Sequence, residues 1–217
     1  MKAMLLAAGR GERLRPLTDT TPKALVEVRG KPLIDYHLEA LGRAGCEQVV
    51  INLGWLGNKI LDHVGDGGRF GVRVVFSPEG ENILETGGGI LRALPMLGSD
   101  PFVVMNGDVF TDMPVPSTDL ADGSLAKLIL VPTPDYKQRG DFDLKGDRVV
   151  SSDEPLLTFS GVAVYEPEFF NGCEPGRFPL APMFYQLADE GRLQGERYDG
   201  VWEDVGTKER LDALNGG

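Results

Sequence analysis

Histidine and cysteine are scarce in this sequence, with two of each among 217 residues. Cys46 and Cys173 are far apart and neither belongs to a C-x-x-C pair, so the sequence indicates neither a disulfide framework nor a zinc site. His37 and His63 lie in helix-like patterns, which are more typical of ordinary helix residues than of ligands. Catalysis that depends on histidine or on a metal–thiolate centre therefore has few candidates.

Long apolar runs and an excess of positive charge are also absent. No run approaches the roughly 20 apolar residues that a membrane span requires, and the first apolar stretch, residues 3–8, is shorter than the core of a signal peptide. The formal net charge is −11, whereas nucleic acid favours a basic surface. We therefore expect a cytoplasmic protein that binds neither membranes nor nucleic acid. No heptad or apolar stripe indicates its oligomeric state.

Basic residues are nevertheless concentrated near the N-terminus. A local positive cluster on an acidic protein fits a small polyphosphate ligand better than a long polyanion. A solvated surface patch is the alternative. The cluster consists of Lys2, Arg10, Arg13, Arg15, Lys23, Arg29 and Lys31.

Strand-like and helix-like segments alternate in the first half of the chain. Short apolar runs predict strands at residues 3–8, 48–53, 72–77 and 101–108. Apolar residues at three- and four-residue spacing predict helices at 32–45 and 55–66, and residues 81–97 predict a loop leading into a helix with Thr86 as its N-cap. This alternation indicates an α/β protein with a doubly wound, mostly parallel sheet.

The second half is less regular. Residues 125–132 and 156–165 predict strands, 141–152 a hairpin, and 180–191 a helix, followed by strands around Tyr198 and Trp202 and a last helix from about Thr207. The length suits one domain, residues 1–217. We expect a nucleotide-binding half at about 1–124 and a second half at about 125–217, whose small β-rich insertion completes a substrate pocket.

The loop after the first strand carries the strongest local signal, LAAGRGERLRPLT followed by PKAL. Gly9 and Gly11 let the backbone approach a phosphate closely, but Leu14 occupies the third glycine position of a dinucleotide fingerprint. Arg13 offers two parallel hydrogen bonds to a terminal phosphate, and Lys23 offers a point charge. Because long loops in compact domains are usually functional, a phosphate-binding loop over residues 8–25 is favoured over a plain surface turn.

Two carboxylates and a glycine triplet complete the candidates. Asp108 ends an apolar strand in NGDV, and Asp204 lies in WEDVGT. Each fits a turn or capping residue, but carboxylates that face a triphosphate suggest an intervening Mg²⁺. Three consecutive glycines, residues 87–89, weaken a helix by about 1 kcal/mol each relative to alanine. Their bare backbone suits either a flat base lying on it or tight packing against the first strand.

These pieces, in this order, resemble the signatures of the sugar-1-phosphate nucleotidyltransferases. LAAGRGERLRPLT with PKAL is similar to that family's phosphate loop, LETGGGI to its base-contacting segment, NGDV and WEDVGT to its two metal aspartates, and FSGVAVY to its sugar-facing strand. The resemblance extends from residue 2 to about residue 214. Within the family, the compact length, LETGGGI and SPEGE are most similar to the N-acetylmuramate α-1-phosphate uridylyltransferases of cell-wall recycling.

The resemblance implies a Rossmann-like fold and a Mg²⁺-dependent reaction in which a sugar 1-phosphate attacks UTP to give a UDP-sugar and pyrophosphate. It implies catalytic roles for Lys23, Arg13 and Asp108, and metal binding by Asp108 and Asp204. It also makes the second half the sugar-binding half. By the same resemblance the nucleotide contacts Ala8, Gly9, Gly11, Arg13, Lys23, Thr86 and Gly87, and the sugar contacts Asn106 and Gly161.

The chain departs from the family pattern in one place. Many members carry E-K-P after the central hairpin, where this chain has DEPLLTF without lysine. The carboxylate of an N-acetylmuramate acceptor also calls for a basic residue, and the choice among Arg29, Arg139, Arg177 and Arg197 is open. Alternative functions are a guanylyltransferase for mannose or heptose phosphate, a phosphocholine cytidylyltransferase, and a non-catalytic regulatory relative that binds a sugar nucleotide.

Overall fold

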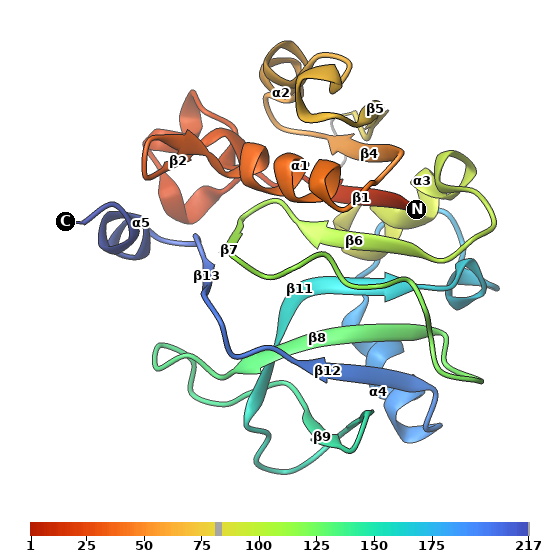
Figure 1. Cartoon of the computed structure of the whole chain (residues 1–217). Helices are drawn as coiled ribbons and strands as arrows, with labels where there is room; N and C mark the ends of the chain where they lie inside the picture. The colour runs from red at the N-terminus through yellow and green to blue at the C-terminus, as the bar shows by residue number, and fades with distance from the viewer. Residues whose placement is uncertain (81–83, 217) are drawn as a thin grey trace.

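A single nine-stranded sheet runs through the whole molecule in the order β5-β4-β1-β6-β11-β8-β12-β10-β9 (Figure 1). The computed structural model describes residues 1–80 and 84–216. Glu81, the last residue of SPEGE, and the adjoining Asn82 and Ile83 of the expected loop lie outside the described residues.

The first half forms the parallel part of this sheet, as the alternating pattern predicts. Strands β5, β4, β1 and β6 are paired side by side and all run in the same direction. Helices α1, α2 and α3 connect them. The elements are β1 (Lys2–Leu6), α1 (Leu33–Arg43), β4 (Gln48–Leu53), α2 (Gly57–Val64), β5 (Arg73–Pro78), α3 (Glu85–Leu97) and β6 (Phe102–Asn106).

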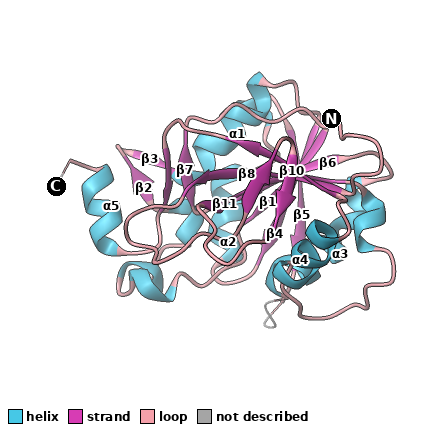
Figure 2. Cartoon of the chain, turned by 90° about the horizontal axis from the view of Figure 1, so that it is seen from below, coloured by secondary structure: helices cyan, strands magenta, loops and turns pink. Residues whose placement is uncertain are grey.

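Helices cover both faces of the sheet, which confirms the doubly wound prediction. Because side chains alternate along a strand, Ala3 and Leu5 enter one core with α1 and α2, whereas Met4 enters a second core with α3 and α4 (Ala181–Asp189). Figure 2 shows α3 and α4 together on one side of the sheet. No helix within residues 1–80 and 84–216 combines the length and apolar character that crossing a membrane requires.

The second half continues the same sheet with mixed strand directions. Strand β11 runs antiparallel to both β6 and β8, β12 runs parallel to β8, and β9 and β10 form the expected antiparallel hairpin. The boundary near residue 124 stays a prediction. The strands are β8 (Ala126–Pro132), β9 (Asp143–Lys145), β10 (Arg148–Val150), β11 (Leu157–Tyr165) and β12 (Leu193–Arg197).

Two small antiparallel pairs lie beside the carboxyl ends of β1 and β6. Strand β7 (Val109–Thr111) pairs with β13 (Trp202–Asp204), and β2 (Glu27–Val28) pairs with β3 (Lys31–Pro32). A third apolar cluster holds these pairs to the first loop and to α5 (Lys208–Leu214). Its buried members are Leu14, Val26, Val28, Leu33, Phe110, Val205 and Leu211.

The N-terminus of α3 differs from the prediction, whereas that of α5 agrees with it. Thr86 is the second residue of α3, and the N-cap is Leu84, which makes no side-chain capping bond. Thr207 does cap α5, because its hydroxyl accepts a hydrogen bond from the Arg210 N–H at 3.4 Å. The prediction for Thr86 is wrong because the helix begins one residue earlier, with Glu85 at a positive φ of 58°.

His37, on α1, is buried against β7, and its burial makes the stability of the folded protein depend on pH. Burial lowers the pKa of His37 to about 4, although a backbone hydrogen bond with Val109 and the charge of Asp108 favour its protonated form. Its Nε2 has no hydrogen-bond partner among the described residues. The folded protein therefore holds this imidazole in its neutral form at neutral pH.

We predict that the stability contributed by neutral His37 is fully present above about pH 6.5. It falls as the pH drops toward 4, because His37 of the unfolded chain binds a proton at a higher pH than His37 of the folded protein. Between pH 7 and 4.5 the His37 contribution is a loss of roughly 2–3 kcal/mol. Urea unfolding across this range should show a shallower pH dependence in His37→Asn than in the matched control His63→Asn. Equal slopes in both variants would contradict the assignment.

Candidate active site

Three cavities meet at Asp108, at the edge of the sheet where β1 and β6 end. The first has a volume of about 270 Å³, the second about 270 Å³, and the third about 430 Å³. Asp108 lines all three. Ligands of open α/β sheets bind outside the carboxyl ends of the strands, so this position is the expected one for a site.

The first cavity lies between the end of β1, the start of α3 and the β6–β7 turn. Ala8, Gly9, Lys23 and Thr86, all predicted to contact the nucleotide, line it. Its wall also contains Asn52 and Glu79, which the sequence did not single out. The Asn52 carboxamide oxygen accepts from the Ala7 N–H at 2.6 Å, and its NH₂ donates to Glu79 at 2.7 Å. This buried pair fixes the first residues of the loop.

The third cavity is formed by the predicted phosphate loop. Gly9, Gly11, Arg13 and Lys23 line it together. The loop is more regular than expected, because it contains three short 3₁₀ helices at Glu12–Leu14, Leu17–Asp19 and Lys23–Leu25. Gly11 has a φ of 63°, and its carbonyl accepts the Thr18 hydroxyl at 2.8 Å. The loop is therefore held in a defined conformation by its own hydrogen bonds, with Gly9 and Gly11 at the surface of the third cavity.

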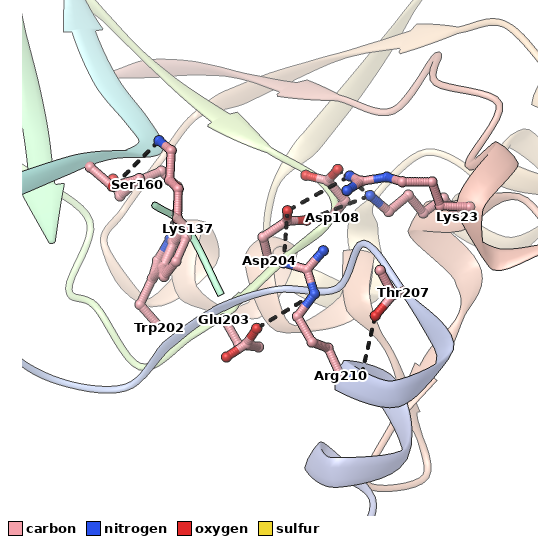
Figure 3. Close-up of polar contacts among 11 residues, drawn as sticks. Lys23, Asp108, Lys137, Ser160, Trp202, Glu203, Asp204, Thr207 and Arg210 are labelled. Atoms are coloured by element: carbon pink, nitrogen blue, oxygen red, sulfur yellow. Dashed lines mark hydrogen bonds and ion pairs between the residues drawn. The ribbon is translucent and has the colours of Figure 1, made fainter. Parts of the chain in front are cut away.

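Lys23 stands between the two aspartates that the sequence assigned to a metal. Its Nζ lies 2.5 Å from Asp108 Oδ2 and 3.7 Å from Asp204 Oδ1. The pairing of β7 with β13 places Asp204 opposite Val109, and the Val205 N–H donates to the Asp108 carbonyl at 2.9 Å. The two carboxylates, distant in sequence, thus face one cleft (Figure 3).

Arg210 contacts one oxygen of Asp204, and the other oxygen has only the longer ionic contact with Lys23. Arg210, from α5, lies 3.2 Å from Asp204 Oδ2, and Arg13 lies 3.9 Å from the same oxygen. Asp204 Oδ1 is buried and has no hydrogen-bond partner in the described part of the chain. Burial also raises the pKa of the neighbouring Glu203, which Arg210 opposes. A carboxylate oxygen that has a cationic neighbour at 3.7 Å but accepts no hydrogen bond keeps its capacity to bind a cation.

The donor set fits a magnesium ion that is completed by substrate. Within residues 1–80 and 84–216, no group of three or more His, Cys, Asp or Glu side chains converges on one metal position. Asp108 and Asp204 supply two hard oxygen ligands. Mg²⁺ is commonly bound by one or two carboxylates together with water and substrate phosphates, rather than by an all-protein cage. Two aspartates beside a phosphate loop match that chemistry.

The second cavity extends from the aspartates toward the second half of the chain. Asn106 and Gly161, the predicted sugar contacts, both line it. Gly161 has a φ of 81° and lies where the pairing of β11 with β8 shifts register, and a Cβ there would lie 2.6 Å from the Asn106 amide nitrogen. A side chain at this position would therefore be strained and would displace Asn106.

None of the four arginines considered for an acidic acceptor lines this cavity. Arg29 lies near the C-terminus, and Arg139 donates to the Ser152 carbonyl. Arg177 pairs with Glu85 at 2.7 Å, and Arg197 pairs with Asp199 at 2.7 Å. A contact between one of these arginines and the acceptor stays a prediction, which their partners outside the second cavity do not favour.

Lys137 is the basic residue that the sequence analysis missed. It lines the second cavity with Tyr136, Asp141 and Thr158. Lys137 Nζ donates to the two Asp141 carboxylate oxygens at 2.7 and 2.8 Å. The i, i+4 spacing of Lys137 and Asp141 is a weak signal for an ion pair in the sequence, but only the folded loop shows that the pair faces a cavity.

The glycine triplet of α3 packs against the protein. A Cβ on Gly87 would overlap the Phe178 ring, one on Gly88 would overlap the Gly176 carbonyl, and one on Gly89 would lie 2.7 Å from the Glu79 carboxylate. Tight packing, the alternative raised above, therefore accounts for the triplet, though the principal contacts are with residues 176–178 rather than with β1. Gly87 does not line the first cavity, so a contact with the base stays a prediction that its packing does not favour.

Comparison with known proteins identifies the relatives of the chain. A family model described as nucleotidyl transferase matches residues 2–131. The N-acetylmuramate α-1-phosphate uridylyltransferase of Neisseria meningitidis serogroup B is 49% identical, over 97% of this chain and 95% of that protein. The protein of the same name from Caulobacter vibrioides is 36% identical, over 94% of this chain and 91% of that one.

Solved structures support the fold. A putative glucose-1-phosphate thymidylyltransferase from Bacillus anthracis, in complex with sucrose, superposes with a TM-score of 0.86 over 100% of this chain and 94% of that one, at 21% identity. HddC from Yersinia pseudotuberculosis gives a TM-score of 0.81 over 99% of this chain and 98% of that one, at 23% identity. At these identities the likeness concerns the fold, and it confirms the α/β class.

We predict that Gly9→Ala folds normally but binds a nucleoside triphosphate at least about tenfold more weakly, a loss of about 1.4 kcal/mol. A Cβ at residue 9 meets no atom within 4 Å, and the space around it belongs to the first and third cavities. Thermal melting and a calorimetric UTP titration would measure the two effects.

Gly88→Ala is the contrasting variant, because its Cβ would overlap the Gly176 backbone. It should lower the melting temperature clearly. Unchanged UTP affinity in Gly9→Ala would mean that the loop backbone does not approach the phosphates.

Proposed function

The chain belongs to the nucleotidyl transferase family, and we propose that it transfers a uridylyl group from UTP to N-acetylmuramic acid 1-phosphate, releasing pyrophosphate. The observation that carries the proposal is the convergence of three cavities on Asp108, with Lys23 and Asp204 beside it. One cavity suits a nucleoside, one a polyphosphate and one an acceptor. Similarity over nearly the whole length of two N-acetylmuramate α-1-phosphate uridylyltransferases supports the choice of substrates.

In the proposed reaction, a phosphate oxygen of the acceptor attacks the α-phosphorus of UTP in line, and pyrophosphate leaves. The attacking oxygen is already anionic at neutral pH, so the enzyme needs no general base. Its task is to hold two anionic substrates in contact and to stabilise the charge that develops between them. The meeting of the second and third cavities at Asp108 brings acceptor and triphosphate to the same point.

Each cation of the site has a distinct position for this task. Lys23 lines the first and third cavities, where it can contact the α-phosphate. Arg13 lines the second and third, where it can hold the leaving pyrophosphate or the acceptor phosphate. The backbone of Gly9 and Gly11 faces the same space. Together these groups offset the negative charge of the phosphates.

Asp108 and Asp204, which both line the second cavity, would hold Mg²⁺ through their carboxylate oxygens. When bound, the ion would neutralise charge on the α-phosphate and lower the repulsion between the two anions. Arg210 fixes the orientation of Asp204 by occupying its other oxygen. We further propose that the reaction takes place in the cytoplasm, because UTP is an intracellular nucleotide. The similarity to N-acetylmuramate α-1-phosphate uridylyltransferases supports a role in the recycling of cell-wall sugars.

A panel of substrates tests this function. UTP, dTTP, GTP and CTP would each be combined with N-acetylmuramic acid 1-phosphate, N-acetylglucosamine 1-phosphate, mannose 1-phosphate, a heptose phosphate and phosphocholine, and pyrophosphate release measured. The proposal expects the highest kcat/KM for UTP with N-acetylmuramic acid 1-phosphate. A clear preference for another pair would replace it, and nucleotide binding without any turnover would favour a regulatory protein.

We predict that Asp108→Asn folds normally and lowers kcat by at least about a hundredfold, the scale observed when one strong charge-stabilising contact is removed. The carbonyl of residue 108, which accepts the Val205 N–H, is kept in this variant. Steady-state kinetics at saturating Mg²⁺ would measure the effect, with Asp199→Asn as the control, because Asp199 lies on the surface paired with Arg197. Near-normal turnover of Asp108→Asn would refute the metal role.

A further inference from the structure

We propose that Lys137 binds the carboxylate of the acceptor sugar and so selects acceptors that carry one. The inference rests on the proposed function, because N-acetylmuramic acid differs from N-acetylglucosamine by a lactyl ether that ends in a carboxylate. Such a group carries a full negative charge at neutral pH and is costly to bury without a partner.

The second cavity has two distinguishable ends. Arg13, Asn106 and Asp108 also line the first or third cavity, so they mark the end where the acceptor phosphate must meet UTP. Lys137 and Asp141 line the second cavity alone. In Figure 3, Lys137 lies on the side of Ser160 and Trp202, apart from the cluster of Lys23, Asp108 and Asp204. A sugar with its 1-phosphate at the first end presents its ring substituents to the second.

Lys137 is the cation at this far end. Among the described residues that line the second cavity, the basic side chains are Arg13 and Lys137, and Arg13 belongs to the phosphate end. The side chains of the four arginines considered above have partners outside the cavity. An acceptor carboxylate at the far end would therefore find Lys137 as its basic partner.

The surroundings of Lys137 hold its ammonium in place. Asp141 accepts from it at 2.7 and 2.8 Å, and Asp141 is itself fixed by the Phe159 N–H at 3.0 Å. The Thr158 hydroxyl lies 3.4 Å from Lys137 Nζ. An ammonium has three donors, and a carboxylate that replaces the long contact to Thr158 would gain a charge-assisted hydrogen bond, roughly twice as strong as a neutral one. The side chain is still 35% exposed, so it is open to a ligand.

The test compares two acceptors in Lys137→Met, which keeps an unbranched side chain, one atom shorter, and removes its charge. With saturating UTP, we expect KM for N-acetylmuramic acid 1-phosphate to rise at least about tenfold, with kcat within about threefold. For N-acetylglucosamine 1-phosphate, which lacks the carboxylate, KM should stay within about twofold. If this acceptor is turned over too slowly, its inhibition constant against the first acceptor gives the same comparison. Lys137→Arg should retain most of the affinity.

Two control variants separate recognition from structure. Arg139→Met removes a neighbouring charge that does not line the cavity, and both KM values should stay unchanged. The double variant Lys137→Met/Asp141→Asn removes the pair together, so that no carboxylate is left without its partner. It should fold and show the same selective loss for the carboxylate-bearing acceptor.

The possible results are distinct. Equal increases of KM for both acceptors would overturn the proposal and assign Lys137 to the 1-phosphate. Unchanged KM for both would remove Lys137 from recognition altogether. A wild-type enzyme that does not use N-acetylmuramic acid 1-phosphate would refute the proposed function itself, before any variant is compared.

Discussion

The short antiparallel pair of β7 and β13 is the constraint on which the site depends. It places Asp204 opposite Val109, and therefore beside Asp108, although the two aspartates belong to distant parts of the chain. Three paired residues on each strand would hold little by themselves. The pair is stable because Phe110, two residues after Asp108, and Val205, which follows Asp204, are buried in the third apolar cluster with Leu14 of the first loop. One small core thus positions the loop and both carboxylates together.

The charges around Asp204 show why this arrangement needs α5. Two carboxylates that face one cleft repel each other, and Lys23 and Arg210 offset that repulsion from opposite sides. Arg210 comes from α5 and also lies over the Tyr136 ring, 4.2 Å from its centroid. Tyr136 lines the acceptor cavity next to Lys137. The last helix therefore links the orientation of Asp204, the proposed metal ligand, to the loop that borders the second cavity.

The sequence predicts the parallel half of the sheet, and it predicts that the first loop and Asp108 meet at one edge, because the signals there are local. A strand that ends in glycines, a lysine after a proline and an aspartate at a strand end all meet at one sheet edge by the topology of parallel strands. The residues that contact the glycine triplet and those that surround Lys137 cannot be predicted in this way. Phe178 packs on Gly87, and Asp141 and Thr158 surround Lys137, through contacts that the folding of irregular segments decides. Spacing along the chain carries little information about them.

This difference in predictability follows a division of labour in the fold. The groups that face phosphate are attached to the ends of β1 and β6 in the centre of the sheet, where pairing on both sides leaves little freedom. The groups that line the second cavity beyond Asp108 include residues of β11, at its bulge around Gly161, and of the loop that contains Lys137. Lys137 and Asp141 line the second cavity but neither of the other two, whereas Lys23 lines only the first and third. In the proposed function, the groups that every sugar phosphate would need are therefore placed by the central strands. The groups that would select among sugars are placed by β11 and by the irregular loop that contains Lys137.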